Sequence, residues 1–172
     1  MTRALVALGA NLGARRDTLR AAISALGRLP RTRLLATSAL RETDPVDCAP
    51  GAPGFVNGAC LLETELSPRE LLEELLRVER EHGRRRDGRR NAPRTLDLDL
   101  VLHGEADVHA PDLVVPHPRA HLRRFVLEPA ADVAPGMLHP RLGRTVAQLL
   151  ADLRAAGGAA RGEAADGSRC GP

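Results

Sequence analysis

The sequence predicts an α+β protein in which an antiparallel sheet carries packed helices on one face. Between residues 3 and 102, apolar patterns follow one another as strand, helix, strand, strand, helix, strand. This order is that of a ferredoxin-like sandwich. The length of 172 residues suits one domain with its own core. We expect that domain to span residues 1–155, and we expect residues 156–172 to be a disordered tail, because they offer little apolar bulk.

The first half of the chain predicts three strands and one helix. Residues 3–8 alternate and form the first strand, and a glycine-containing turn leads to a helix that Asp17 caps and that ends before Gly27. Residues 33–43 and 55–65 form the next two strands. The connecting residues 44–54 hold three prolines and two glycines, which predicts a loop.

The second half begins with a well-marked helix. Ser67 and Glu70 form a capping box around Pro68, so a helix begins here and continues to His82, where Gly83 ends it. The remaining predicted elements are an arginine-rich loop over residues 83–93, a strand over 95–102, a short extension near 106–108, a proline-rich segment over 111–118, a short helix near 119–124 and an amphipathic helix over 144–155.

The composition excludes several classes of function. All 25 basic residues are arginine, so no lysine can serve a P-loop or form a Schiff base, and any phosphate must be held by arginine or backbone. No apolar run reaches the roughly 20 residues of a membrane span. The net charge of +3 suits an anionic ligand but falls short of a nucleic-acid-binding signature.

The cysteines indicate the compartment. Cys48, Cys60 and Cys170 have no metal-ligand spacing, and no secretion signal precedes them. We therefore expect free thiols in a reducing cytoplasm.

Two aspartates stand out in the strand predicted over residues 95–102. Period two places Asp97 and Asp99 on one face and the alternating leucines from Leu96 to Leu102 on the other. Two carboxylates about 7 Å apart can share hard cations of the kind that bridge nucleotide phosphates. The alternative is a half-exposed strand whose aspartates pair with arginines. Aspartate is depleted in strands, which favours metal binding.

The loop just upstream holds six arginines between Gly83 and Arg94. The planar guanidinium group matches phosphate oxygens. Taken alone, such a run is more often a solvated loop or one that faces nucleic acid. Beside an acidic pair of metal-ligand spacing, it favours polyphosphate binding instead.

Two further positions offer ligand chemistry. Phe55 and Asn57 share one face of the third strand and could present a ring and an amide to a ligand together. In an isolated pair of this kind, however, the phenylalanine is more often a core residue and the asparagine a polar residue at the end of the strand. His117 could donate a hydrogen bond to a phosphate or cap the helix that follows it.

Taken together, these residues form a pattern that resembles the 6-hydroxymethyl-7,8-dihydropterin pyrophosphokinases of folate biosynthesis. The likeness runs from about Ala4 to Leu150, and its most specific segment is Pro93 to Asp99. The matching positions are Thr43-x-Pro45, Phe55-x-Asn57, Glu79, Arg84-x-Arg86, the run Arg90 to Asp99, Pro116-His117 and Arg123-x-Phe125.

The resemblance implies a reaction and a set of ligands. The pyrophosphoryl group of ATP would pass to the hydroxymethyl oxygen of the pterin, and AMP would leave. Two Mg²⁺ ions would bind Asp97 and Asp99, with Arg84 and Arg94 closest to the transfer. The pterin would stack between Phe55 and Phe125, its edge contacting Thr43, Val46 and Asn57. The ATP side would comprise Glu79, Arg84, Arg86, Arg90, Arg94, Leu100 through its backbone, His117 and Arg123. We further expect a cytoplasmic monomer whose partners are these two small molecules, with no nucleic acid and no membrane.

The chain also departs from the family pattern. Asn91 stands where well-known members carry a tryptophan that closes over the site, and Leu76, Asp112 and Pro118 replace a glutamine, a basic residue and a tyrosine on the nucleotide side. The metal, transfer and pterin positions are intact.

Two other classes compete with this interpretation. A magnesium-dependent nucleotidyl transferase or cyclase can share the topology and use aspartates on strands, because a fold does not dictate a function. Such an enzyme would not require Phe55, Asn57 and Phe125. An RNA-binding module would stack bases on several sheet aromatics, whereas this sheet offers one.

Overall fold

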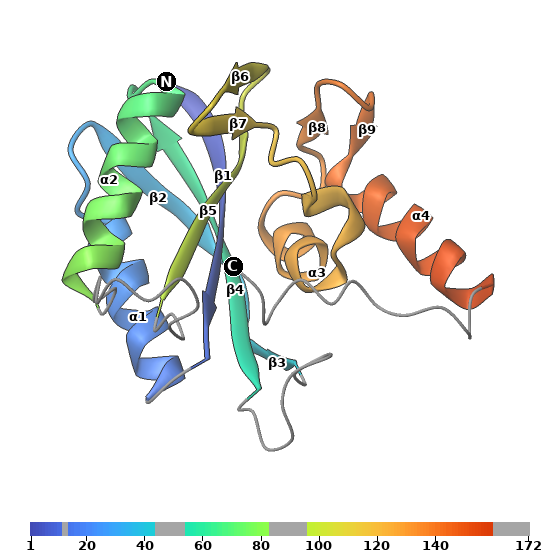
Figure 1. Ribbon diagram of the computed structural model, residues 1–172, viewed down its shortest axis with the longest axis horizontal. Helices are drawn as coiled ribbons and strands as arrows, with labels where there is room; N and C mark the ends of the chain where they lie inside the picture. Colours follow the sequence, from blue (N-terminus) through green and yellow to red (C-terminus); the bar gives the residue numbers. More distant parts are fainter. Residues whose placement is uncertain (12–13, 44–53, 83–95, 160–172) are drawn as a thin grey trace.

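The computed structural model describes residues 1–11, 14–43, 54–82 and 96–159 of the chain. Figure 1 shows a central sheet with α1 and α2 on one side and α3 and α4 on the other. The elements in chain order are β1 (Thr2–Ala10), α1 (Arg15–Leu26), β2 (Thr32–Thr37), β3 (Arg41–Thr43), β4 (Phe55–Thr64), α2 (Pro68–Glu81), β5 (Asp97–His103), β6 (Val108–Ala110), β7 (Leu113–Val115), the 3₁₀ helix η1 (Ala120–Leu122), α3 (Arg124–Val133), β8 (Leu138–His139), β9 (Arg144–Thr145) and α4 (Val146–Ala159).

The main sheet has five strands, and every pairing in it is antiparallel. The strand order is β2-β4-β1-β5, and β3 also pairs with β4. Helix α1 connects β1 to β2, and α2 connects β4 to β5. This arrangement is the ferredoxin-like one and confirms the predicted fold class. It leaves β5 at an edge of the sheet.

The first core lies between the sheet and the helices α1 and α2. Leu19 and Leu26 of α1 and Leu71 and Leu75 of α2 are fully buried there against alternate residues of the strands. Burying each such leucine contributes about 1.5 to 3 kcal/mol. The chain builds this core from aliphatic side chains and one cysteine, as its scarcity of aromatic residues predicts.

The two helices of this layer begin differently. The capping box of α2 is confirmed: Ser67 Oγ accepts the Glu70 N–H at 3.2 Å, and Glu70 Oε2 accepts the Ser67 N–H at 2.7 Å. The predicted cap of α1 is wrong, because this helix begins at Arg15 behind Ala14, which makes no side-chain cap. Asp17 lies in the first turn, where a negative charge also favours the helix dipole.

The opposite face of the sheet is also covered, which corrects the prediction of helices on one face. Helices α3 and α4 enclose a second core with Leu5, Ala59 and Leu61 of the strands. Helix α3 was not predicted, because Pro129 lies inside it and proline normally interrupts a helix. Helix α4 begins two residues later than predicted, after β9, and continues to Ala159. The first four residues of the predicted tail are therefore helical, and residues 160–172 lie outside the described residues.

Two strands depart from the predicted pattern. The segment predicted as one strand over residues 33–43 divides into β2 and β3, and both pair with β4. In β5 the register with β1 shifts by one residue near Val101. Leu98 and Leu100 face the first core, whereas Val101 and Leu102 both reach the second. Leu102 therefore does not share a face with the preceding leucines, because a β-bulge adds one residue.

Over the described parts of the chain, no helix is long and apolar enough to cross a membrane. Cys60 is a free cysteine in the first core, and burial raises the pKa of its thiol to about 12. Cys48 and Cys170 lie outside the described residues.

Candidate active site

The candidate site occupies the part of the sheet that carries small and polar residues on the face toward α3. Gly9 of β1 is in register with Asn57 of β4 on one side and with Asp97 of β5 on the other. Two residues back along β1, Ala7 is in register with Ala59 and Asp99 in the same way. Registered neighbours lie about 4.5 to 5.5 Å apart, so Asn57 and Asp97 face each other across a floor of small residues about 10 Å wide.

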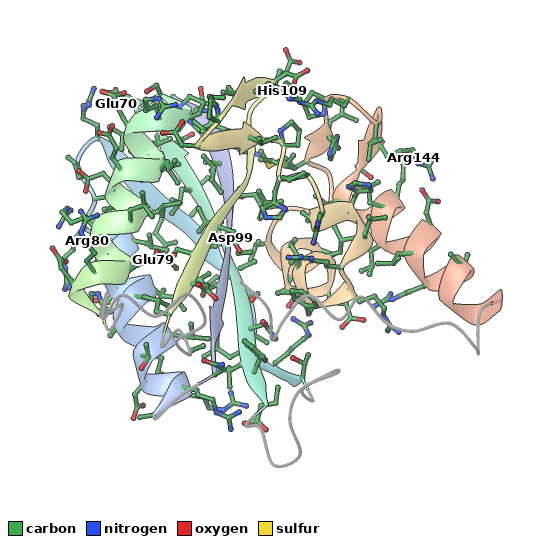
Figure 2. The ribbon with its side chains drawn as sticks, viewed as in Figure 1. Glu70, Glu79, Arg80, Asp99, His109 and Arg144 are labelled. Carbon is green, nitrogen blue, oxygen red and sulfur yellow. The ribbon has the colours of Figure 1, made fainter. Side chains whose placement is uncertain are left out.

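The acidic pair lies on the face that the sequence predicted. Asp97 is half-buried and Asp99 is exposed, while Leu98 between them is buried in the first core. Figure 2 shows Asp99 on the side of β5 toward α3, opposite Glu79 of α2. The two carboxylates are therefore presented to the site and not to the first core.

Glu79 holds the backbone between the two aspartates. Its side chain is only 4% exposed, and its Oε1 accepts the N–H of Leu98 at 2.8 Å. Because β5 is an edge strand, this N–H points away from β1 and needs a partner outside the sheet. By the same alternation, Leu100 directs its backbone groups to this edge. Glu79 thus fixes the start of β5, a role that its family match alone did not suggest.

Asn57 and Thr43 form a polar pair beside the floor. Asn57 is 3% exposed, and its Nδ2 donates to Thr43 Oγ1 at 3.0 Å. A Cβ atom at Gly9 would lie 3.5 Å from Asn57 Oδ1, so the glycine keeps this side of the floor open. Phe55 is in register with Thr43 and is buried, but among the described residues it belongs to neither apolar core.

Phe125 approaches the site from the start of α3. It is partly buried and packs against the second core. The guanidinium carbon of Arg123 lies 5.6 Å from its ring centroid, a cation–π distance. The ring thus combines a core contact with a position near the cationic side of the site.

His117 follows β7 and faces the acidic strand. Its Nδ1 accepts the Arg119 N–H at 3.2 Å, so the neutral ring carries its proton on Nε2. Burial lowers the pKa of His117, and Arg123, Arg119 and His121 lower it further, whereas the negative charge of Asp99 acts in the opposite direction. The predicted capping role is thus confirmed at Nδ1, whereas a hydrogen bond from Nε2 to a phosphate stays a prediction.

The donor set fits magnesium. Asp97 and Asp99 provide hard carboxylate oxygens at neighbouring positions of one strand face. Magnesium usually takes one or two carboxylates and completes its shell with water and substrate phosphates. Within residues 1–11, 14–43, 54–82 and 96–159, no group of three or more potential ligands gathers, so the phosphates and water would supply the rest.

The structure brings together most of the residues that the sequence singled out. Thr43, Phe55, Asn57, Asp97 and Asp99 share one face of the sheet, and Phe125, Arg123 and His117 approach that face from outside it. Glu79 contacts β5 from α2 through the Leu98 N–H, and its predicted role on the ATP side stays a prediction. Val46, Arg84, Arg86, Arg90 and Arg94 fall outside the described residues, so their predicted roles stay predictions.

Two features of the site were not predicted. The floor of Gly9 and Ala7 was missed, although two small residues at alternate positions near the end of β1 were a visible signal. Arg41 and Asp132, which join β3 to α3, were also missed. They are 91 residues apart, and no local pattern links them.

Comparison with known proteins identifies the family. The family model described as 7,8-dihydro-6-hydroxymethylpterin-pyrophosphokinase (HPPK) matches residues 5–135. The 2-amino-4-hydroxy-6-hydroxymethyldihydropteridine pyrophosphokinase of Pseudomonas aeruginosa is 48% identical over 149 residues, which cover 87% of this chain and 90% of that protein. The enzyme of the same name from Haemophilus influenzae is 40% identical over 140 residues, 81% of this chain and 86% of that protein.

Solved structures agree with the fold. The wild-type Plasmodium falciparum HPPK-DHPS with SDX-DHP aligns with a TM-score of 0.68 at 14% identity, covering 88% of this chain. This chain spans 43% of that longer protein, and the likeness concerns the fold alone. On the family match and on the identity to its relatives, the chain belongs to the 7,8-dihydro-6-hydroxymethylpterin-pyrophosphokinase family.

Proposed function

We propose that this enzyme transfers the pyrophosphoryl group of ATP to the hydroxymethyl oxygen of 6-hydroxymethyl-7,8-dihydropterin and releases AMP, as a step of tetrahydrofolate biosynthesis. The observation that carries the proposal is the row across the sheet in which Gly9 separates Asn57 from Asp97. A buried amide and an acidic metal ligand thus lie on two sides of a floor without bulky side chains. That spacing suits a flat heterocycle whose reacting arm reaches toward the acidic pair.

The pterin side of the site supplies edge contacts and flat faces. Asn57 and Thr43 meet the polar edge of the ring, together with the backbone of Val46. Phe55 from the sheet and Phe125 from α3 supply the two faces between which the ring stacks. Aromatic stacking adds about 0.5 to 1.5 kcal/mol per pair beyond the burial of area.

The nucleotide side supplies positive charge. Arg84, Arg86, Arg90, Arg94 and Arg123 hold the phosphates, His117 donates from Nε2, and Leu100 contributes backbone groups at the free edge of β5. Two Mg²⁺ ions on Asp97 and Asp99 would neutralise phosphate charge when bound. The side chain of Glu79 keeps the two carboxylates in place by holding the amide of Leu98.

The reaction is an in-line displacement at phosphorus. The hydroxymethyl oxygen forms a bond to the β-phosphorus of ATP, and the bond from that phosphorus to the oxygen bridging the α-phosphorus breaks. AMP leaves with the bridging oxygen, and the hydroxyl proton passes to solvent. Arg84 and Arg94 meet the charge that develops on the transferring group, so positioning and electrostatics supply the catalysis.

We further propose that the enzyme acts in the cytoplasm as a monomer and that it binds no nucleic acid. The free thiol of buried Cys60 and the moderate net charge support the compartment and the ligand class.

The proposal is tested by product analysis with the purified chain. ATP, the dihydropterin and magnesium should yield AMP and the pterin diphosphate in equal amounts. Asp97→Ala and Asp99→Ala should each abolish turnover without unfolding the protein, whereas Asp107→Ala, which removes an exposed aspartate paired with Arg141, should keep it. Formation of ADP, or near-normal turnover by either site variant at saturating magnesium, would refute the proposal.

A further inference from the structure

An ion pair joins β3 to α3 beside the proposed pterin site. Arg41 Nη1 donates to Asp132 Oδ2 at 2.6 Å, and Arg41 Nη2 donates to Asp132 Oδ1 at 2.9 Å. The pair is therefore bidentate, the geometry in which a guanidinium fixes both the distance and the orientation of a carboxylate. The Arg41 guanidinium, and with it a hydrogen bond from the Ala39 backbone, holds the pKa of Asp132 below its usual range.

One end of this pair belongs to the wall that would read the pterin edge. Arg41 is the register partner of Asn57, and it precedes Thr43 by two residues on the same face of β3. Across the sheet, the same row continues through Asn57 and Gly9 to Asp97. A displacement of β3 would therefore move Thr43 relative to Asn57 and the floor.

The other end belongs to the helix that carries Phe125. Asp132 follows Phe125 by seven residues, about two helical turns, so the two side chains lie on nearly the same face of α3. The ion pair thus connects the strand that holds the edge-reading residues with the helix that holds one stacking ring, at the end opposite the ring. Besides the packing of α3 on the sheet, this is a directional contact between the two walls.

We propose that Arg41 and Asp132 are positioning residues for the pterin site: their bidentate pair sets the separation between Thr43 and Asn57 on the sheet and Phe125 on α3, into which the pterin ring must fit. The inference rests on the proposed function, because it concerns the same site. Neither residue is assigned a contact with the pterin. Their ion pair raises the fraction of enzyme molecules in which the two walls have the separation that binds the pterin ring.

The pair is a weak contributor to global stability. The two side chains are 36% and 34% exposed, and ion pairs of such exposure add little to the free energy of folding. A loss of pocket geometry should therefore be visible in pterin affinity while the melting temperature changes little. This separation makes the inference testable.

The test compares Arg41→Ala, Asp132→Ala and the double variant with the unmodified enzyme. The dissociation constant for 6-hydroxymethyl-7,8-dihydropterin should rise about threefold to fivefold in each single variant, because apparent affinity falls with the competent fraction. The double variant should be no weaker than either single one, since all three lack the same pair. Affinity for an α,β-methylene analogue of ATP should stay within about twofold. Arg41→Lys should recover only part of the loss, because lysine lacks the fork.

The chain offers a matched control. Arg144 Nε and Nη2 donate to Asp152 Oδ2 and Oδ1 at 3.1 and 2.7 Å, which is another exposed bidentate pair. It joins β9 to α4, and Figure 2 shows Arg144 well to the side of the sheet and of Asp99. Arg144→Ala should therefore leave pterin affinity unchanged, with a change in melting temperature similar to that of Arg41→Ala.

The titration can be read optically, because the chain contains no tryptophan or tyrosine and the pterin absorbs apart from it. If Arg41→Ala binds the pterin as tightly as the unmodified enzyme, or weakens ATP analogue and pterin alike, the positioning role is refuted. Failure of the unmodified enzyme to bind the pterin would instead refute the proposed function, so the two failures are distinguishable.

Discussion

Removing the carboxyl group of Glu79 should damage the acidic strand from behind. In the structure this side chain accepts the backbone N–H of Leu98, which lies between Asp97 and Asp99 at the free edge of the sheet. Leu98 is 3% exposed, so water cannot replace the lost acceptor without opening the edge. Glu79→Ala should therefore lower both stability and turnover.

The size of the effect follows from the contact. An unsatisfied buried donor costs about 1 to 3 kcal/mol. For a domain of this size, each kcal/mol shifts the melting temperature by about 2 to 4 °C, so Glu79→Ala should melt about 2 to 12 °C lower. A small displacement of catalytic groups costs about 100-fold in rate, and we expect turnover to fall about 10- to 100-fold. Glu79→Gln keeps an acceptor oxygen and should lose less stability and less turnover than Glu79→Ala.

The assay combines thermal unfolding with AMP release as a function of magnesium concentration. Glu73→Ala is the control, because Glu73 is exposed on the same helix and its removal tests helix α2 without touching β5. The Glu79 variant should need more magnesium for half-maximal turnover. If the Glu79 variant has the same melting temperature and the same magnesium dependence as the Glu73 control, the hydrogen bond to Leu98 does not position the aspartates and the reasoning is wrong.

Three further predictions concern other parts of the molecule. Phe125→Leu should weaken pterin binding severalfold and leave the affinity for ATP nearly unchanged. If the variant instead unfolds while its folded molecules bind the pterin as tightly as before, the ring belongs to the second core alone. Arg94→Lys should lower turnover more than it lowers ATP affinity, because lysine lacks the planar fork. If steady-state kinetics show equal losses of turnover and ATP affinity, Arg94 only helps to bind ATP in the ground state. The Ser67 backbone and, secondarily, Arg31 lower the pKa of Glu70 from 4.5 to about 2, so its stabilisation is present above pH 4.5 and is lost as the pH falls toward 2. Acid titration of Glu70→Gln should show a flatter loss of stability across that range, and a curve parallel to the unmodified enzyme would contradict this.

The sequence predicts the first layer of the fold well, because its signals are local. The capping box at Ser67 and the alternation around Asp97 fix α2 and the start of β5 without reference to distant residues. The second layer is different. Pro129 hides α3 from a periodicity argument, and its burial of Val126 and Ala130 depends on a sheet face that the chain forms elsewhere.

The candidate site shows the same division. The residue types at Asp97, Asp99, Phe55 and Asn57 already indicate their chemistry, and the sheet brings them to one face. The contact of Glu79 with Leu98 and the pair of Arg41 with Asp132 require knowledge of which elements lie side by side. Such contacts join residues 19 and 91 positions apart, and no spacing rule in the sequence connects them.

The bulge at Val101 has a consequence for how substitutions in β5 should be interpreted. Before it, the odd positions Asp97 and Asp99 belong to the site and the even positions Leu98 and Leu100 to the first core. After it, Val101 and Leu102 both belong to the second core. In a saturation mutagenesis of this strand, tolerance to polar residues should therefore alternate up to residue 100 and then cease to alternate. Because Val6 pairs with Leu100 and Leu5 with Leu102, deleting Val101 would restore a regular ladder and leave the other residues of β5 on their faces. Its cost should come from the loss of one apolar side chain from the second core and of the carbonyl that accepts the His117 N–H.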